Sequence, residues 1–557
     1  MKRTSALTLL ALLLILPACQ SPTDLMFGYT GEDELLPQVR GMGQLATNVL
    51  HPQPDTAPDV PVAHAGVNPF GINVFLNQEV EPEKRERSVQ MIADAGFHWL
   101  RQEFPWEDIE ISAKGDFWDH KWDQDAWKKY DDIVDLAEQY DLEIVPRLSN
   151  PPSWSRAAGD AGGHKAPPDD LTDWGDYVHA VVSRYRGRVR YYQLWNEPNV
   201  YPEWGDQPVD PDAYTQLLCE GYARAKEADP DAVIISGALA PTVNLDVGDR
   251  PETGMNDFVF LQRMYDAGAA ECFDILAVND YMLWSGPTDH RMKPLNINFA
   301  RPIYLRDIMV ANGDAAKSIW ISEMNSNAVP NDPEHIHGVG VYGMVTPEQQ
   351  ARYAPLAYQR AMEEWPWMGA VNFWFFKLPS DAEQNQSWYY FRMVEPDFTP
   401  MPVYDAMKAY IADLEPTLYP GYHQESHWAL AYEGEWTHQQ ASESALANYV
   451  QTSETGATLH FVYEGAALTL VPGPGTGEIE VTVDGSVPQR IPLDGKPVRL
   501  AGGLVRARHE IVLTAVSGRV SVDGLVVQQP WSPPLWLVAG TIGALTVAIV
   551  FFRRARR

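Results

Sequence analysis

Short apolar runs alternate with longer amphipathic stretches between residues 68 and 415. Each run has the length of a buried strand, and the stretches between them repeat their apolar residues with the period of a helix. Strand followed by helix, eight times over, is typical of a (β/α)8 barrel. The runs are residues 71–75, 98–104, 143–148, 189–195, 232–237, 273–280, 318–323 and 370–376, and helix candidates lie within 121–140, 173–187, 212–230 and 347–365.

An open, doubly wound sheet would show a similar alternation of strands and helices. Such sheets usually carry a glycine-rich phosphate turn after their first strand, and the first run here, GINVFLNQ, has none. We therefore expect an α/β fold whose strands close into a TIM barrel over residues 68–415.

From about residue 420 the apolar period changes to two, which is typical of half-buried antiparallel strands. Glycine and proline turns separate these runs, and Val-Asp-Gly triplets end two of them, at residues 483–485 and 522–524. The pattern predicts an all-β sandwich over residues 420–529 as a second domain.

The first residues have the composition of an export signal. Lys2 and Arg3 precede an apolar run, and Cys19 follows Leu-Pro-Ala, which is similar to a bacterial lipobox whose cysteine is acylated. We expect residues 1–19 to be a lipoprotein-type signal peptide with lipidation at Cys19, and secretion without a lipid is the alternative. The proline-rich residues 20–67 lack apolar periodicity and predict a tether to the first domain.

The last residues predict a membrane span. Residues 535–552 are apolar and uncharged and reach the minimum length of a transmembrane helix, and four arginines follow in residues 553–557. Positive charge after a span places the C-terminus in the cytoplasm as a short basic tail. We therefore expect the folded domains to lie at the cell surface, outside the membrane that anchors them.

Charge and cysteine content narrow the possible partners. A formal charge of −33 excludes a nucleic-acid partner, because the phosphate backbone would be repelled. Beyond Cys19 only Cys219 and Cys272 remain, too few for a disulfide scaffold, and their spacing does not say whether they pair.

Two predicted strands end in a carboxylate. The fourth run ends in Trp-Asn-Glu-Pro, with Glu197 held where Pro198 interrupts the strand, because proline has no N–H for the ladder. Such a four-residue string arises by chance in a chain of this length on the order of once in a thousand. The seventh run ends in Glu323.

Barrels place reactive groups at the carboxyl ends of their strands, so Glu197 and Glu323 are expected at one mouth. Two carboxyl groups facing each other over a cleft are the minimum for glycoside hydrolysis, one protonated and one ionised. A single glutamate at a strand end would be only an exposed charge.

With these motifs, residues 68–415 resemble clan A retaining glycoside hydrolases, closest to families 39 and 5. The resemblance implies that Glu197 is the acid/base and Glu323 the nucleophile. It implies further roles at the substrate: Asn196 for the sugar 2-hydroxyl, Arg101 for keeping the nucleophile ionised, and Tyr281 for a hydrogen bond to it. Those families commonly have histidine where this chain has Asn279, which leaves the sugar contacts open.

Aromatic side chains near strand ends suit stacking on the apolar face of a sugar ring. Trp374 on the eighth run, Trp154 after the third and Trp284 after the sixth are the candidates, and Trp374 also matches the families. Any one tryptophan could instead belong to the core. Trp106 is expected only to shape the loop after the second run.

No cofactor or metal is expected, since retaining hydrolysis needs none and His335 and His337 lack partners at metal-ligand spacing. The second domain resembles the jelly-roll modules of surface carbohydrate enzymes, and could bind glycan or act as a spacer. The sequence thus predicts a membrane-anchored extracellular hydrolase of β-linked oligo- or polysaccharides. A non-catalytic polysaccharide-binding barrel and a transglycosylase with the same site are the alternatives.

Overall fold

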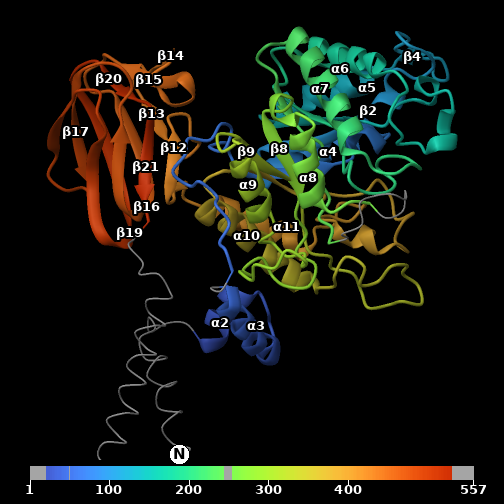
Figure 1. The fold of residues 1–557 in the computed structure, drawn as a ribbon, viewed down its shortest axis with the longest axis horizontal. Coiled ribbons are helices and arrows are strands. Elements are labelled where there is room, and N and C mark those ends of the chain that lie inside the picture. Colours follow the sequence, from blue (N-terminus) through green and yellow to red (C-terminus); the bar gives the residue numbers. More distant parts are fainter. Residues whose placement is uncertain (1–20, 49–50, 244–253, 530–557) are drawn as a thin grey trace, which may run out of the picture.

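A computed structural model describes residues 21–48, 51–243 and 254–529 (Figure 1). A closed barrel surrounded by helices stands beside an all-β domain, which is drawn in orange and red in Figure 1. A small helical hairpin formed by α2 and α3 lies apart from the β domain.

The barrel has eight parallel strands in the closed order β1-β10-β9-β8-β7-β6-β5-β2, which confirms the predicted TIM barrel. Every strand overlaps one of the apolar runs identified in the sequence. The strands are β1 (Phe70–Val74), β2 (Trp99–Pro105), β5 (Glu143–Ser149), β6 (Tyr191–Leu194), β7 (Val233–Ile235), β8 (Ile275–Asn279), β9 (Ser318–Met324) and β10 (Met368–Phe373).

Helices follow the strands and begin at side chains suited to capping. The Asp170, Asp210 and Asn256 side chains accept hydrogen bonds from the first backbone N–H groups of α6, α7 and α8, which otherwise have no partner. The barrel helices are α4 (Pro82–Asp94), α5 (Lys128–Gln139), α6 (Leu171–Tyr185), α7 (Pro211–Ala228), α8 (Asp257–Asp266), α9 (Pro302–Ala311), α10 (Pro347–Glu364) and α11 (Pro402–Asp413). Helix α5 begins later than the helical pattern suggested, because residues 118–125 contain the two-stranded hairpin β3 (Trp118–Asp119) and β4 (Gln124–Asp125).

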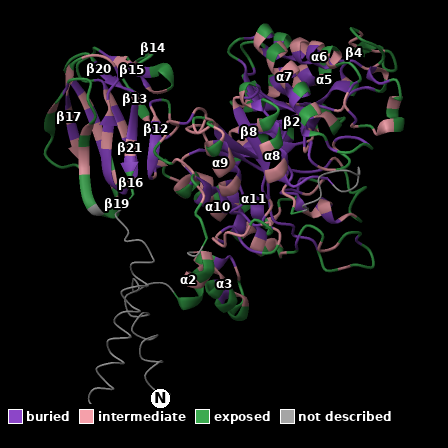
Figure 2. Cartoon of the chain, viewed as in Figure 1, coloured by how far each residue is buried: buried purple, intermediate pink, exposed green. Residues whose placement is uncertain are grey.

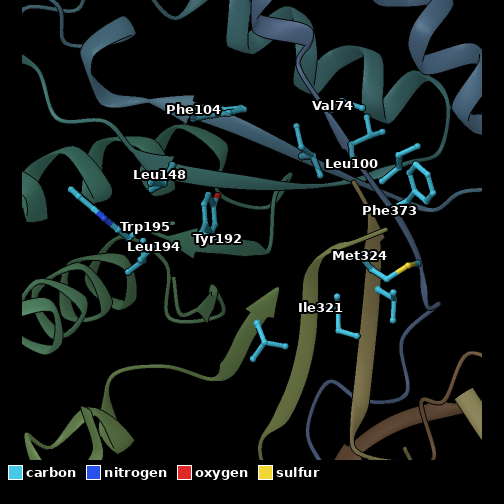
Figure 3. Close-up of a cluster of buried hydrophobic side chains, with 14 of the residues drawn as sticks. Val74, Leu100, Phe104, Leu148, Tyr192, Leu194, Trp195, Ile321, Met324 and Phe373 are labelled. Carbon is cyan, nitrogen blue, oxygen red and sulfur yellow. The ribbon is translucent and has the colours of Figure 1, made fainter. Parts of the chain in front are cut away.

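Alternate residues of each strand face different surroundings, as the pleat requires. Leu100, Leu148 and Ile321 belong to the cluster between strands and helices that Figure 3 shows. Residues of the other parity fill the barrel, where Trp320 lies 5.2 Å from Trp99 and 5.0 Å from Tyr191, measured between ring centroids. These rings belong to a separate buried cluster inside the barrel, so the strand ends beyond them are free to carry polar groups.

The second domain consists of two sheets that are antiparallel except where β11 pairs with β16, in agreement with the predicted β domain after the barrel. The larger has the path β12-β21-β16-β19-β17-β18, with β11 and β13 also paired to β16, and the smaller has the order β14-β15-β20. Val450 and Val520 of the smaller sheet share a core with Leu459 of the larger. The strands are β11 (Thr417–Leu418), β12 (Gly421–Gln424), β13 (Ala431–Glu433), β14 (Thr437–Gln440), β15 (Asn448–Thr452), β16 (Thr458–Val471), β17 (Gly477–Val483), β18 (Gln489–Leu493), β19 (Val498–Gly518), β20 (Val520–Val522) and β21 (Gly524–Gln528).

The segment interpreted as a tether, residues 20–67, contains two helices that the pattern did not predict. Helix α2 (Pro22–Thr30) begins with a capping box between Ser21 and Asp24 and ends at Gly31, whose φ of 61° suits glycine. Helix α3 (Leu35–Asn48) follows directly. The rest of the segment also contacts the barrel, since the Arg306 side chain donates to the Thr56 carbonyl.

Among the residues that the structure describes, no helix combines the length and apolar character needed to cross a membrane. The predicted signal peptide at 1–19, with Cys19, lies outside those residues, as do the predicted span at 535–552 and the tail at 553–557. All three stay predictions.

Cys219 and Cys272 form a disulfide, which settles the pairing that their spacing left open. Cys219 lies on α7, and Cys272 lies shortly before β8. The bridge therefore ties one barrel helix to the chain that enters a strand carrying part of the candidate site.

Replacing both cysteines by alanine should destabilise the barrel. The bridge closes a loop across a sequence separation of 53 residues, for which the chain-entropy model gives roughly 4 kcal/mol of stability. Guanidinium unfolding followed by tryptophan fluorescence should show a lower midpoint for the C219A/C272A variant. Reduction of the wild-type protein should produce the same shift, and an unchanged midpoint in both experiments would contradict this role.

Candidate active site

Glu197 lies on a sharply turned segment directly after β6. Trp195 and Glu197 have φ values of 80° and 40°, a region that residues other than glycine rarely occupy. Hydrogen bonds hold this backbone in place: the Trp195 N–H donates to Leu148 O at 2.8 Å, and the Glu197 N–H donates to Ala238 O at 2.9 Å. The turn therefore fixes the Glu197 side chain at the carboxyl end of the strand.

Arg101 on β2 donates hydrogen bonds to four side chains of the site and is only 3% exposed. Its Nη1 donates to Glu323 Oε1 at 3.1 Å, and its Nη2 donates to Asn196 Oδ1 at 3.0 Å. Nη1 also donates to Asn73 at 2.6 Å, and Nε donates to Gln193 Oε1 at 2.7 Å. Burial lowers the pKa of Arg101 to about 10, with Glu323 acting in the opposite direction, so the guanidinium keeps its charge at neutral pH.

Glu323 on β9 is 4% exposed, and its two oxygens accept from different side chains. Arg101 donates to Oε1, and the Tyr281 hydroxyl donates to Oε2 at 2.5 Å. Burial, followed by the charge of Glu323, raises the pKa of Tyr281 well above its usual value, so the phenol stays protonated and donates. The Arg101 guanidinium and the Tyr281 hydroxyl thus each contact one oxygen of this side chain.

Glu197 has the opposite environment. Its Oε1 accepts a hydrogen bond from Asn279 Nδ2 at 2.7 Å. Burial, with the negative charges of Glu323 and Glu203 as smaller causes, raises the pKa of Glu197 to about 8. Glu197 is therefore protonated at neutral pH while Glu323 sits in a cationic pocket, which is the division of roles that a pair of catalytic carboxyl groups requires.

Shared neighbours bring the two carboxyl groups to the same mouth. Asn279 and Tyr281, two positions apart at the end of β8, contact Glu197 and Glu323 respectively. Arg101 joins Glu323 to Asn196, the residue before Glu197. Because the two groups lie close together, the charge of Glu323 also raises the pKa of Glu197.

Trp374 directly follows β10 and belongs with this group. It packs in one cluster with Tyr281 and Phe75, with its ring centroid 5.7 Å from that of Phe75 and nearly perpendicular to it. Trp374 is partly exposed. The structure thus places five residues proposed for substrate binding around the two glutamates, namely Asn196, Arg101, Tyr281, Asn279 and Trp374.

The other two tryptophans have different surroundings. The Trp154 indole N–H donates to the Glu110 carbonyl at 2.8 Å, and its ring packs edge-on against the buried Trp106 at 5.6 Å. Trp284 is 67% exposed and lines a cavity of about 410 Å³ with loop residues such as Arg291 and Leu295. Neither tryptophan has a contact with Glu197 or Glu323 among the interactions of the described residues.

Three polar residues inside the barrel were not identified from the sequence. The Asn73 amide donates to Ser322 O at 2.8 Å and Phe373 O at 3.1 Å, and its Oδ1 accepts from Arg101. The Gln193 amide donates to Ser322 Oγ at 2.9 Å. These contacts link β1, β2, β6 and β9 beneath the carboxylates. Polar residues inside otherwise apolar strand runs were the feature that could have revealed them.

Two further ion pairs lie beside the carboxyl groups. Lys165 donates to Glu203 Oε1, while Glu203 Oε2 accepts from Asn196 Nδ2 at 3.4 Å. On the neighbouring wall, Arg147 donates to Glu103, which also accepts from Asn150 at 3.1 Å. The charge of Glu203 raises the pKa of Glu197, and the charge of Lys165 lowers it.

Neutralising Glu203 should shift the pH dependence of any reaction that needs protonated Glu197. Glu203→Gln removes a negative charge that helps to raise the pKa of Glu197, so the alkaline limb of kcat/KM should move to lower pH. Lys165→Met removes a charge that lowers this pKa, so the limb should move to higher pH. Glu227→Gln, with the same change of charge on a largely exposed side chain of α7, is the control. Equal shifts in all three variants would contradict the assignment of the alkaline limb to Glu197.

Within the described ranges, no group of three or more His, Cys, Asp or Glu side chains could hold a metal ion. His335 is exposed and contacts only the nearby Asp332 carboxylate at 2.9 Å among the interactions recorded for the described chain.

No protein-family model and no curated protein matches the chain. Similar solved structures include a family 39 glycoside hydrolase from Bacteroides cellulosilyticus WH2, at 18% identity over 82% of this chain and 80% of that one, with a TM-score of 0.46. The GH39 enzyme from Xanthomonas axonopodis pv. citri has 14% identity, covering 84% of this chain and 98% of that one, with a TM-score of 0.43. A GH39 β-xylosidase from Caulobacter crescentus has 14% identity, covering 83% and 99%, also with a TM-score of 0.43.

Structures from family 39, one of the two families that the sequence resembles, are thus among those similar to this chain. What this protein does has to be inferred from the residues gathered at its own strand ends.

Proposed function

We propose that this protein is a retaining glycoside hydrolase that cleaves β-linked glycans by double displacement. The observation that carries the proposal is the unequal pair of carboxyl groups at one barrel mouth. The pKa of Glu197 is raised to about 8, and Glu323 lies between Arg101 and the Tyr281 hydroxyl. One acid and one carboxylate are the two groups that this reaction needs.

In the first step the Glu323 carboxylate attacks the anomeric carbon, and the bond to the leaving oxygen breaks. Each Glu323 oxygen accepts one hydrogen bond in the structure and keeps a lone pair for the attack. Glu197 transfers its proton to the leaving oxygen and becomes ionised. Because Asn279 donates to Glu197 Oε1, the proton belongs on Oε2, which accepts no hydrogen bond from the residues that the structure describes.

In the second step ionised Glu197 takes a proton from water, and the water oxygen attacks the anomeric carbon of the glycosyl-enzyme. The bond to Glu323 breaks, and both side chains return to their starting protonation states. The retaining reaction requires the two carboxyl groups to lie about 5–5.5 Å apart, and this separation is part of the proposal.

Neighbouring side chains suit a sugar at this position. The partly exposed Trp374 offers an apolar ring beside Tyr281, and the Asn196 amide lies next to Glu197, where it can donate to a hydroxyl of the bound sugar. One of the similar enzymes is named as a β-xylosidase. We propose that this protein likewise acts on a β-linked substrate.

The proposed activity can be tested with aryl β-glycosides and β-linked polysaccharides. The full-length protein should hydrolyse at least one member of such a panel, and the Glu323→Gln variant should not hydrolyse it. Binding of a polysaccharide without release of reducing ends by the wild-type protein would contradict the proposal and favour a binding barrel.

We further propose that the protein is anchored at the cell surface through lipidated Cys19 and the apolar residues 535–552. The lipobox-like sequence and the basic residues after 552 support this location. The Cys219–Cys272 disulfide also supports it, since such bonds persist outside the reducing cytosol. Mass spectrometry of the N-terminal peptide from membranes should find acylated Cys19, and an unmodified N-terminus would contradict the lipid anchor.

A further inference from the structure

The outward side of helix α3 contains an apolar stripe, with the exposed Arg40 beside it. Leu35, Leu36, Val39 and Met42 are 58%, 82%, 56% and 39% exposed, and Ala46 is exposed as well. At 100° per residue, positions 35, 39, 42 and 46 form one narrow stripe along the helix, and Leu36 lies at its edge, one turn before Arg40. Figure 2 shows this hairpin with much of its surface exposed.

The side of α3 that faces the protein contains the polar Gln38 and the small Gly41, both buried, beside the partly exposed Leu45. Gln38 is buried, and its amide donates to the carbonyls of Thr23 at 3.1 Å and Glu32 at 2.8 Å. Gly41 lies against Thr30, where an added Cβ would come within 2.8 Å of the threonine methyl carbon, and the Asn48 amide donates to His290 O at 3.1 Å. A surface helix usually has the reverse arrangement, with apolar residues inside and polar residues outside.

Contacts to the barrel fix the direction in which this stripe faces. The Tyr353 hydroxyl on α10 donates to Asp33 at 2.5 Å, and the Phe27 and Tyr353 rings stack with centroids 6.0 Å apart. Glu32 forms an ion pair with Arg291 at 2.7 Å. The hairpin is therefore joined to the catalytic domain, and Figure 1 shows it at a distance from the β domain.

The place of α3 in the sequence indicates what covers the stripe. Helix α2 begins at Pro22, three residues after Cys19, and the apolar run from residue 6 to 16 precedes it. Helix α2 spans only about 14 Å at 1.5 Å per residue, so a lipid on Cys19 would hold α3 close to the bilayer surface.

Charge favours a membrane over a second copy of the chain. Every copy carries a formal charge of −33, which opposes close approach of two molecules. The stripe itself contains no charged side chain, so its contact with a bilayer would come from apolar burial.

We propose that the stripe formed by Leu35, Val39, Met42 and Ala46, with Leu36 at its edge, lies in the interfacial layer of the membrane and orients the barrel above it. This inference depends on the proposed lipid anchor. Interfacial helices insert their apolar face by about 5–10 Å. With α3 in that position, the contacts of Phe27 and Asp33 to α10, and of Glu32 to Arg291, would hold the barrel at a fixed tilt to the membrane.

The test uses the full-length, membrane-extracted protein in phosphatidylcholine vesicles. A Leu36→Cys variant is labelled with an environment-sensitive fluorophore, and emission is compared between normal lipid and lipid brominated near the head of its acyl chains. The control is Val487→Cys, which is 84% exposed on the β domain. Cys219 and Cys272 are bonded to each other, so wild-type protein treated with the fluorophore should take up no label. This control shows that labelling is specific to the introduced cysteine.

Brominated lipid should quench most of the emission at position 36 and little at position 487. Vesicle flotation with equal emission in both lipids at position 36 would overturn the proposal while leaving the anchor intact. A protein that does not float would contradict both the anchor and the docking. Self-quenching that rises with protein concentration, without quenching by bromine, would show a second copy on the stripe and would equally overturn the proposal.

Discussion

Glu323→Ala should lose on the order of 10⁵-fold or more in kcat, because the side chain that forms the covalent intermediate is gone. This is the largest effect that the site predicts. Glu323→Gln should be as inactive, although its amide oxygen keeps an acceptor for one of the two donors, Arg101 or the Tyr281 hydroxyl. The measurement is the steady-state hydrolysis of the best aryl glycoside from the panel.

Two controls separate chemistry from folding in this experiment. Thermal unfolding of the Gln variant should stay close to that of wild type, and Glu478→Gln on β17 changes the same charge outside the barrel. Substantial activity in both Glu323 variants would contradict the role of nucleophile.

Glu197→Ala should reduce hydrolysis by about 10²–10⁴-fold, the range that acid–base catalysis contributes. The loss should be smaller for aryl glycosides with good leaving groups, because they need little protonation in the first step. Breakdown of the glycosyl-enzyme should then limit turnover, since no base activates water.

Azide provides a sharper result, because an anion can occupy the space left by the Glu197 carboxylate. It should restore turnover of activated substrates by Glu197→Ala and give a glycosyl azide with the β-configuration of the substrate. With Glu323→Ala, azide would attack from the opposite face and give the α-azide. The same anomer from both variants would contradict the assignment of the two glutamates to opposite faces.

The barrel could be predicted because its strands are buried on both sides. Such strands appear in the sequence as continuous apolar runs, and residues 143–148 and 318–323 correspond closely to β5 and β9. The two glutamates could be located for a related reason, since a charged residue directly after a buried run has to lie at the strand end.

The network beneath the carboxylates was harder to infer. Asn73 and Gln193 are single polar residues within apolar runs, and their partners come from strands distant in sequence. The environment of Trp154 and Trp284 also could not be predicted from the sequence, because an aromatic residue after a strand can turn toward the mouth, the core or solvent. Only contacts such as that of the Trp154 indole with Glu110 separate these cases.

The helical hairpin was missed for a physical reason as well. Periodicity analysis looks for an apolar face that packs on the core, whereas α3 buries Gln38 and Gly41 and exposes Leu36 and Val39. Such a helix gives an unusual pattern, and the prolines around it favour the interpretation as a tether.

The central claim is that Glu323 forms a covalent bond to the sugar. A 2-deoxy-2-fluoro glycoside with a good leaving group, made from the sugar preferred in the panel, should slow release of the intermediate and let it accumulate. Peptide mapping by mass spectrometry should then find the added sugar mass on the peptide that contains Glu323. The same mass on another peptide, or hydrolysis that inverts the anomeric centre with no trapped species, would contradict the account.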